Sequence, residues 1–434
     1  MSPALETDGS GYFVRLAKGG FLVYVVALPL VQLFSFRIGG LQVLFADLLF
    51  LGTTILWLPA IALGQAKFRW SRLYLFVGLF VAAMALSAVF STNPRLSGIK
   101  LLGVCYLATV AVLTFNLCCE PGFVRKVLTA FVVGLVLTAV GVVAAVFGYY
   151  SDWEITRPLL SHIGSLPAGN YPRVRSFFEN ANMACNFLNV ALTAALAMLG
   201  TGRLTYPIGI GIAAAGYLAA LFTISPGLGG ICLSVGVFVW GIGRFKRSTA
   251  ANAVLVGSIA LAIIFLVSTI VSPAWLLNSG SQNEPKYSVR VMVWMDAIKR
   301  AGEYPVLGRG TGTNAADLSY VTVSGQPQYL TDAHNAWLNI LGQSGLVGLV
   351  AFTLLCWYLW SISRFRFDLL SKDNVLLLAL STGLLGSFFY QNIAGSFEDA
   401  RHLWVWIGII AAVHRQVSSS SASAAFPGSK SQLP

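Results

Sequence analysis

The best candidate for acid–base chemistry in this chain is a histidine at the start of a long apolar stretch. Only four histidines occur, and His334 stands within "TDAHNAWLNILGQSGLVG", residues 331–348. Near a helix N-terminus, the helix dipole disfavours the imidazolium and lowers the histidine pKa. A neutral imidazole can accept a proton, so His334 is a candidate general base. The alternative is an interfacial histidine hydrogen-bonded to its loop, with Thr331 or Asp332 capping the helix.

A short predicted helix ahead of His334 carries a candidate anion-binding cation. Residues 288–301 are bounded by proline and glycine, as expected of a helix. At about 100° per residue, Arg290 falls on an apolar face whose other members are Trp294, Ala297 and Ala301. A guanidinium there needs an anionic partner, because an unpaired charge that leaves water is costly. The alternatives to a substrate anion are Asp296, Glu303 or a lipid phosphate.

Further cations lie in the long connections between apolar runs. The stretch "YPRVRSFFENANMACN" contains Arg173 and Arg175, and the glycine-rich "VLGRGTGTN" contains Arg309. Arginine contacts phosphate oxygens in a two-pronged manner, so each of them is a candidate ligand of an anionic group. The glycine-rich turn could also present backbone N–H groups to a phosphate, although many such turns only connect elements.

Long apolar runs must position these side chains. The sequence is 56% hydrophobic and 10% charged, whereas soluble domains carry roughly 25% charged residues. Runs of about twenty residues match the roughly 30 Å bilayer core at about 1.5 Å per residue. We therefore expect an all-α integral membrane protein with about twelve transmembrane helices. The predicted spans are 21–36, 40–64, 72–91, 98–117, 126–149, 181–200, 204–223, 226–243, 251–272, 335–362, 374–394 and 402–414.

Lysine and arginine in the connections predict the topology. With the N-terminus inside, every short inside connection is basic. The predicted organisation is a cytoplasmic tail at 1–20, nine spans at 21–272 with an outside loop at 150–180, a large and partly helical outside loop at 273–334, three spans at 335–416, and a disordered cytoplasmic tail at 417–434. At the start of the tenth span, Gly342, Gly345 and Gly348 recur every three residues, which would let a neighbour approach closely.

Composition argues against several classes of partner. The net charge of +12 follows from the topology and suits anionic membrane lipids, so it does not indicate nucleic acid. The six cysteines show no metal-ligand spacing. The close carboxylate pairs predicted outside, Asp152/Glu154 and Glu398/Asp399, do not form the cluster that a metal-dependent transferase would need. We therefore expect no metal and no other cofactor.

Several motifs together resemble the O-antigen ligase and polymerase superfamily. Its signature is a helix with Arg and Trp, a Pro-x-x-Gly-x-Gly turn, and a His-Asn-x-x-Leu stretch that leads into a Gly-x-x-Gly helix. Here these motifs read "SVRVMVWMDAIKRAGEYPVLGRGTGTN" and "HNAWLNILGQSGLVG", with "RSFFENANMACNFLNV" earlier in the chain. Span number and loop position also fit, so the resemblance covers most of the chain.

The resemblance implies a glycosyltransferase of the bacterial inner membrane with its active site facing the periplasm. An O-antigen ligase moves a glycan from undecaprenyl pyrophosphate to a sugar hydroxyl of lipid A-core. The family histidine maps onto His334 and its loop arginine onto Arg290, while Trp294 and Asn335 are substrate-binding candidates in the same motifs. We expect metal-independent, inverting transfer. An O-antigen polymerase and a protein O-oligosaccharyltransferase are alternatives, and a secondary transporter is a more distant one.

One departure from the family pattern concerns a second phosphate-binding cation. Members often carry Ser-Arg-Gly at the end of a middle span, whereas "TISPGLGG" places Pro226 where that arginine would stand. Arg175 and Arg173, beside "SFFENAN", are the predicted substitutes, with Arg309 behind them.

Several other charged residues and histidines are weaker candidates for the site. Asp47 is predicted inside the second span, where an acid is costly and is either functional or a lock between helices. Arg401 and His402 could face the same cavity as His334, but we favour a pairing of these two residues with Glu398 and Asp399. The remaining histidines, His162 and His414, are predicted to lie at the surface.

Overall fold

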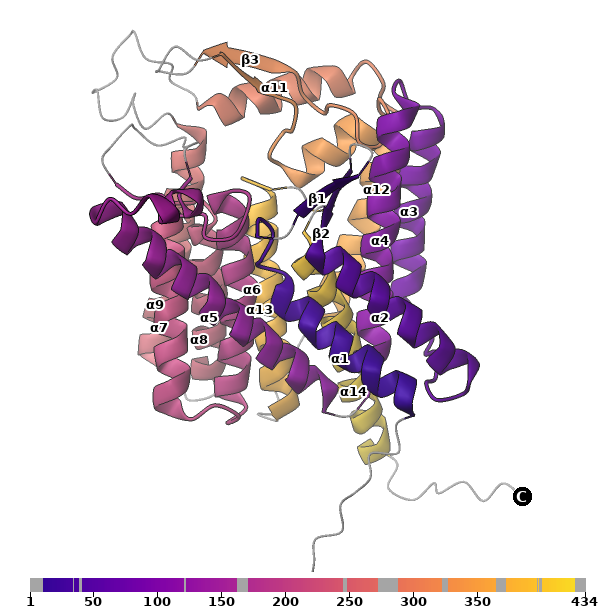
Figure 1. The fold of residues 1–434 in the computed structure, drawn as a ribbon, viewed down its shortest axis with the longest axis vertical. Coiled ribbons are helices and arrows are strands. Elements are labelled where there is room, and N and C mark those ends of the chain that lie inside the picture. The colour runs from indigo at the N-terminus through magenta and orange to yellow at the C-terminus, as the bar shows by residue number, and fades with distance from the viewer. Residues whose placement is uncertain are drawn as a thin grey trace, which may run out of the picture.

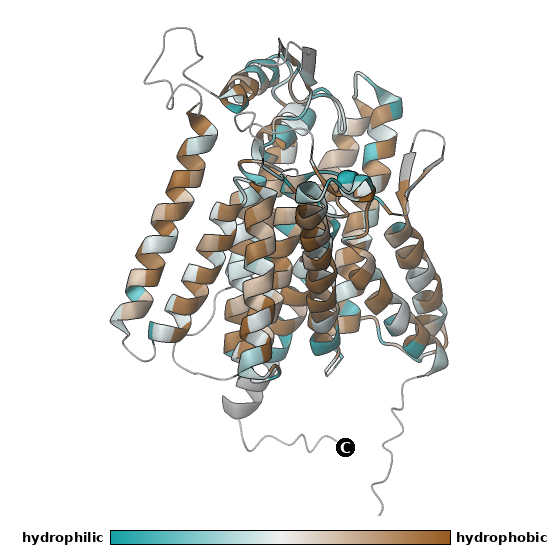
Figure 2. Ribbon diagram, turned by 60° about the vertical axis from the view of Figure 1, so that its left-hand side comes forward, coloured by the Kyte–Doolittle hydropathy of each residue, from teal (hydrophilic) through white to brown (hydrophobic). Residues whose placement is uncertain are grey.

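The chain folds into a bundle of long helices with a smaller layer across one end (Figure 1). The computed structural model describes residues 11–33, 35–38, 41–120, 122–161, 171–244, 248–271, 288–321, 327–363, 372–395, 397 and 400–425. The layer consists of residues 288–321 and 327–335, and we refer to it as the crown. Hydrophobic residues follow the shafts of the bundle helices, and hydrophilic residues gather toward their ends and in the crown (Figure 2).

The helices of the bundle account for every predicted apolar run. They are α1 (Tyr12–Ala27), α2 (Phe45–Ala62), α3 (Leu73–Val89), α4 (Pro94–Cys118), α5 (Phe123–Tyr150), α6 (Ala181–Gly200), α7 (Tyr206–Thr223), α8 (Leu228–Arg244), α9 (Thr249–Ile270), α12 (Ala336–Ile362), α13 (Lys372–Gln391) and α14 (Arg401–Ala425). Among the described residues, eight are long and apolar enough to cross a membrane: α2, α4, α5, α6, α7, α9, α12 and α13. The chain is thus an all-α multi-span membrane protein, and twelve spans stay a prediction.

The first predicted span, 21–36, is misplaced. Helix α1 begins at Tyr12, inside the predicted tail, and ends at Ala27. Pro29 explains the end, because its nitrogen carries no hydrogen to continue the helical hydrogen bonds, although Leu28 still has helical backbone angles. Beyond it, β1 (Ser35–Ile38) pairs antiparallel with β2 (Leu41–Leu44), with Ser35 opposite Leu44. The second span, predicted from residue 40, accordingly begins only at Phe45.

The last helix is longer than predicted. Helix α14 continues to Ala425, beyond the boundary at 416 and into the tail that was predicted to be disordered. Its final turns contain only serine and alanine, which a helix tolerates, and the next proline is Pro427. Within the bundle, α14 packs against α4, α12 and α13, with the indole rings of Trp404 and Trp406 fully buried.

The crown contains the predicted helix and an unpredicted hairpin. Helix α11 (Val289–Ala301) confirms the helix expected at 288–301. Strand β3 (Leu318–Val321) pairs antiparallel with β4 (Pro327–Leu330), and a 3-10 helix, η1 (Glu154–Leu159), lies in the other long connection. The strands are too short for an alternating pattern to distinguish them from a loop.

A break in α12 joins the crown to the bundle. Gly345 has φ 59° and ψ −159°, so the helical hydrogen bonds are interrupted there. The connection after α11 takes them up, since Leu346 N donates to Pro305 O over 2.8 Å and Gly310 N donates to Gln343 O over 2.9 Å. A Cβ at Gly345 would lie 2.4 Å from Val306 carbonyl atoms. At Gly345, the glycine face of α12 therefore packs against the connection after α11, and not against a neighbouring helix as the glycine spacing suggests.

Candidate active site

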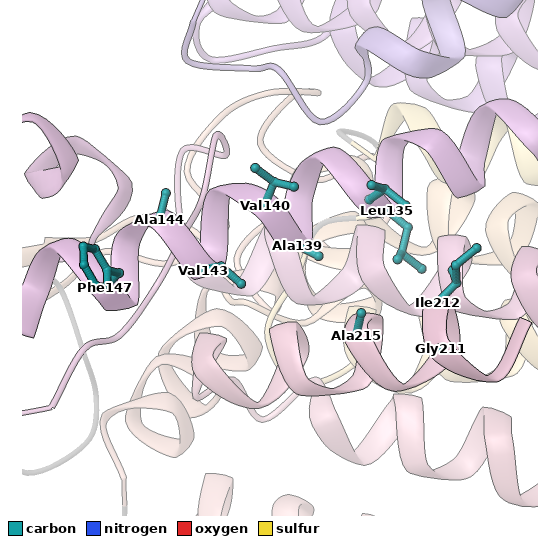
Figure 3. A pocket seen from close by; sticks show the side chains of 10 residues that line it. Leu135, Ala139, Val140, Val143, Ala144, Phe147, Gly211, Ile212 and Ala215 are labelled. Carbon is teal, nitrogen blue, oxygen red and sulfur yellow. The ribbon is translucent and has the colours of Figure 1, made fainter. Parts of the chain in front are cut away.

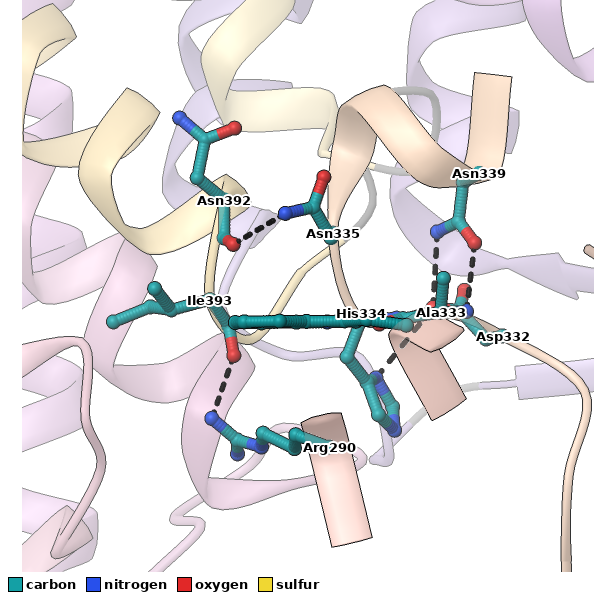
Figure 4. A network of polar contacts seen from close by, with 9 residues as sticks. Arg290, Asp332, Ala333, His334, Asn335, Asn339, Asn392 and Ile393 are labelled. Atoms are coloured by element: carbon teal, nitrogen blue, oxygen red, sulfur yellow. Dashed lines mark hydrogen bonds and ion pairs between the residues drawn. The ribbon is translucent and has the colours of Figure 1, made fainter. Parts of the chain in front are cut away.

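His334 lies on the turn between β4 and α12, at the junction of crown and bundle. Its φ is 50°, a left-handed conformation that is uncommon for a residue with a side chain. The Asp332 carboxylate accepts a hydrogen bond from His334 N, and Asp332 Oδ1 lies 3.5 Å from His334 Nδ1. In Figure 4 the imidazole and the side chain of Arg290 lie below this turn, and Asn339 lies above it. The acid therefore lies beside the Nδ1 edge of the ring and not beside Nε2.

Hydrogen bonds from both flanking helices hold the turn in this conformation. Asn339 of α12 donates from Nδ2 to Asp332 Oδ1 over 2.9 Å, and its Oδ1 accepts from Ala333 N over 2.8 Å. Trp294 of α11 donates from Nε1 to Ala333 O over 2.9 Å. Backbone strain at a site persists only where surrounding contacts over-determine it. Trp294, predicted to bind substrate, thus has a contact that positions the backbone beside His334.

The N-cap of α12 is Asn335, and not Thr331 or Asp332, the two caps considered in the alternative interpretation of His334. Asn335 Oδ1 accepts from Trp337 N and Leu338 N, while Asn335 Nδ2 donates to Asn392 O over 2.8 Å. Asp332 is not the cap because its carboxylate already accepts from His334 N and Asn339. Asn335 therefore joins the start of α12 to the end of α13.

Arg290 reaches the same segment after α13. It lies on the buried side of α11 with Ala297 and Ala301, as predicted, and its NH1 donates to Ile393 O over 2.6 Å. Neither predicted acidic partner is used: Asp296 pairs with Arg300 at 3.3 Å, and Glu303 pairs with Arg309 at 3.2 Å. Among the described residues, no carboxylate forms an ion pair with Arg290. The guanidinium keeps hydrogen-bonding capacity for an added anion.

Burial and charge set the protonation states at this site. Burial lowers the pKa of Arg290 to about 10, and the nearby positive charge of Arg173 acts in the same direction. Burial also lowers the pKa of His334 below its ordinary value; the Asp332 carboxylate opposes this, and Arg290 adds to it. This direction agrees with the expected neutral imidazole, and burial is its largest cause. At neutral pH, Arg290 is charged and His334 is ready to accept a proton.

Arg173 lies at the turn where the family arginine is missing. Its Nε donates to Thr223 O and its NH2 to Asn182 Oδ1, both over 3.2 Å. Ser225 Oγ donates to the same Asn182 oxygen over 2.9 Å, which ties Arg173 to the residue preceding Pro226. Of the three predicted substitutes, Arg173 is the one whose contacts reach this turn and whose charge acts on Arg290.

The other two candidate arginines have different surroundings. Arg175 donates to Pro158 O and Glu179 O, both over 3.0 Å, and so braces its own connection. Arg309 pairs with Glu303 and lies over the ring of Tyr304, 5.4 Å from its centroid. The described contacts of neither residue involve Arg290 or His334.

Backbone N–H groups of the glycine-rich turn donate hydrogen bonds to other parts of the protein. Gly308 N donates to Tyr304 O, Arg309 N to Gly342 O, and Gly312 N to Gln343 Oε1. A Cβ at Gly310 would lie 2.0 Å from Ser91 Oγ. These glycines permit close packing of the turn on α3 and α12, so the turn reads as a connection rather than as a phosphate cradle.

Sequence reasoning missed the segment after α13. Asn392 O accepts a hydrogen bond from Asn335, and Ile393 O accepts one from Arg290. The Tyr390 ring, at the end of α13, is 4% exposed and packs near Gly227 and Gly395. The charges of Arg290, Arg173 and Asp332 all act on the Tyr390 hydroxyl. The available signal was the polar "YQN" at the end of an apolar run.

Asp47 and Arg401 form a lock between helices. Arg401 Nε lies 2.7 Å from Asp47 Oδ1 and NH2 lies 3.0 Å from Oδ2, which is a two-pronged ion pair. Asp47 Oδ2 also accepts from Leu44 N at the start of α2. This outcome favours the structural alternative for Asp47 and gives Arg401 a partner that was not predicted. The expected pairing with Glu398 and Asp399 lies outside the described residues.

The described contacts of His402 and His414 include neither Arg290 nor His334. His402 is buried, with its ring 5.8 Å from that of Phe187 and its Nε2 without a hydrogen-bond partner in the described part of the chain. His414 is partly buried on α14 and not at the surface as predicted, and His162 lies outside the described residues. Within the described ranges, no group of three His, Cys, Asp or Glu side chains could hold a metal ion.

Comparison with known proteins connects the site to a family. A model of the O-antigen ligase family matches residues 191–353, a stretch that contains both Arg290 and His334. No curated protein matches the chain. The match supports a membrane glycosyltransferase of the ligase and polymerase class, for which lipid-linked glycans are the general substrates.

Proposed function

We propose that this chain transfers an O-antigen glycan from undecaprenyl pyrophosphate to a sugar hydroxyl of lipid A-core, at the periplasmic face of the bacterial inner membrane. The observation that carries the proposal is the position of His334 beside Arg290, within the stretch that matches the family (Figure 4), with the charge of Arg173 acting on Arg290. A proton acceptor next to two diphosphate-binding cations is what displacement of a diphosphate requires.

The reaction proceeds in one displacement. The acceptor hydroxyl oxygen forms a bond to the anomeric carbon while the bond from that carbon to the diphosphate oxygen breaks. The electron pair leaves with the diphosphate, and the hydroxyl proton goes to Nε2 of His334, since Nδ1 faces Asp332. Attack opposite the leaving group inverts the anomeric configuration.

Arg290 and Arg173 stabilise the leaving group. Negative charge grows on the diphosphate as the bond breaks, and charge-assisted hydrogen bonds from preorganised guanidinium groups oppose its cost. Arg290 is fixed by Ile393 O and Arg173 by Thr223 O, so neither needs to reorganise when the donor binds. With cations in this role we expect the reaction to be independent of metal ions and of ATP, because the donor bond supplies the driving force.

The acceptor distinguishes the proposed ligase from its relatives. A polymerase would use the same donor chemistry on a growing lipid-linked chain, and a protein O-oligosaccharyltransferase on a hydroxyl of a polypeptide. In the native host, loss of the gene should leave long lipid-linked chains and lipid A-core without polymer. Single repeats on lipid A-core would instead indicate the polymerase.

Purified protein, donor lipid and lipid A-core provide the direct test. We expect transfer in the presence of EDTA and without ATP, measured as a mass shift of lipid A-core on a gel. Transfer that EDTA abolishes and Mg²⁺ or Mn²⁺ restores would contradict the mechanism. Substrate uptake by vesicles that lack donor lipid would instead favour the secondary transporter.

A further inference from the structure

We propose that an apolar groove between α5 and α7 holds the first isoprene units of the donor lipid, an inference that rests on the proposed function. The groove is lined by α5 from Leu135 to Phe147 and by α7 at Gly211, Ile212 and Ala215 (Figure 3). Its volume of about 530 Å³ lies within the range of ligand pockets, roughly 300–1,000 Å³.

The lining suits a branched hydrocarbon chain. Every lining residue is apolar, so the groove offers no hydrogen bond to a headgroup or a sugar. Several are small, among them Ala139, Gly211 and Ala215, which leaves room for methyl branches. A Cβ placed on Gly211 would meet nothing within 4 Å, so this side of the groove is open.

Helix α5 runs into the connection that carries Arg173, and the end of α7 packs against the same connection. At the far end of α5, the Phe147 ring packs edge-on against Trp153, 5.0 Å between centroids, and Gly148 O accepts from Trp153 N. At the end of α7, Thr223 O accepts from Arg173 Nε. Val174 N donates to the adjacent Phe222 O. A diphosphate held by Arg173 would therefore place its attached chain at the Phe147 end of the groove, farthest from Leu135 (Figure 3).

The tethered chain has an advantage over bulk lipid. From Leu135 to Phe147, α5 rises about 18 Å, enough for the units nearest the diphosphate but not for a whole polyprenyl chain. Ordinary phospholipids also meet this surface. Only a lipid whose diphosphate is already bound by Arg173 and Arg290 presents its chain to the groove at a high effective concentration.

Filling the groove should separate chain binding from diphosphate binding. We would compare Ala215→Leu with the control Ala214→Leu in full-length protein, because Ala214 is also exposed on α7 but does not line the groove. The probes are undecaprenyl diphosphate and dimethylallyl diphosphate, and the readout is the dissociation constant of each. Displacing about two methylene-sized groups should weaken undecaprenyl diphosphate binding on the order of tenfold in Ala215→Leu. Dimethylallyl diphosphate binding, and both affinities of Ala214→Leu, should be unchanged.

The readout does not depend on catalysis. Equal, unchanged affinities for undecaprenyl diphosphate in the two variants would overturn the proposal and assign the groove to bulk lipid. Equal weakening of both diphosphates in Ala215→Leu would also overturn it, because the substitution would then act on the headgroup site. Undecaprenyl diphosphate binding could be weakened in Ala215→Leu alone, as expected, while the wild-type protein transfers no glycan. That outcome would contradict the proposed function and support the groove.

Discussion

Two arginines, Arg290 of α11 and Arg401 at the start of α14, differ in what holds them. Arg401 makes a two-pronged ion pair with Asp47, so its charge is neutralised within the protein. Arg290 has a backbone carbonyl, Ile393 O, as its partner, and no described carboxylate neutralises it. A guanidinium that donates to a carbonyl is oriented, but its positive charge is not neutralised. A guanidinium paired with a carboxylate is neutralised and acts as a structural contact between helices. The type of partner, more than burial, distinguishes a candidate binding cation from a structural one.

The same comparison extends to the acid beside the site. The two carboxylate oxygens of Asp47 accept hydrogen bonds from Arg401 and Leu44 N. The described contacts of Asp332 are instead with neutral groups, His334 N and the Asn339 amide, and its carboxylate lies close to the imidazole. One carboxylate therefore stabilises the fold, and the other sets the orientation and proton affinity of the candidate base.

Replacing His334 should have the largest effect on transfer. His334→Gln keeps polarity and approximate size but removes the proton acceptor, which general-base catalysis puts at roughly 10²–10⁴-fold in kcat. The donor affinity should stay within about twofold, since the arginines hold the diphosphate. Steady-state kinetics with donor-binding measurements check this. Near-normal kcat in folded His334→Gln protein would reduce His334 to a positioning residue.

Removing the two arginines should give opposite phenotypes. Arg290→Ala should reduce kcat/KM on the order of 10²-fold with little change in thermal stability, because a charge-assisted contact to phosphate acts on both binding and rate. Arg290→Lys should rescue only partly, since an ammonium lacks the two-pronged contact. Arg401→Ala should cost roughly 2 kcal/mol of stability, because it leaves Asp47 unpaired in a mostly buried position.

A double-mutant cycle would sharpen that contrast. Asp47→Asn with Arg401→Gln should recover part of the melting temperature lost in either single variant, as expected of a pair in direct contact. The comparison fails if Arg401→Ala protein melts normally but loses transfer, because Arg401 would then be a binding cation as well.

Local periodicity predicted the elements, and long-range contacts decided the site. The pattern of residues 288–301 predicted both α11 and the buried face of Arg290. It could not predict Ile393 O as the partner, because that residue is 103 positions away and belongs to a turn that carries no periodic signal. The break in α12 was hidden for a similar reason: a glycine stripe looks the same whether a helix or a loop packs on it.

Arg173 offers an intermediate case, since its described partners include a carbonyl and an amide oxygen. Arg173→Ala should raise the donor KM roughly tenfold to a hundredfold, because a hydrogen bond to a charged group contributes about 1.5–3 kcal/mol. Arg175→Ala, in the same connection, is the matched control and should change the donor KM less. Pro226 is partly exposed beside Ser225. Pro226→Arg should therefore restore donor binding in the Arg173→Ala background, and failure of that rescue in folded protein would separate the two positions.

The smallest expected effect is a shift in pH dependence caused by Asp332. Transfer should require neutral His334, so kcat should fall as the pH drops through the His334 pKa, which burial places below the ordinary value of about 6.5. The Asp332 charge raises that pKa. Asp332→Asn should therefore lower it further and move the acid limb of kcat to lower pH.

Above pH 7 the rate of Asp332→Asn should stay close to that of the wild type, because the asparagine oxygen can still accept the hydrogen bond from His334 N. This distinguishes orientation from catalysis by the acid itself. A pH–rate profile of kcat measured for both proteins provides the test. If Asp332→Asn lost transfer at every pH while His334→Gln kept it, the proton would go to Asp332, and the contrast between an orienting and a neutralising carboxylate would have to be abandoned.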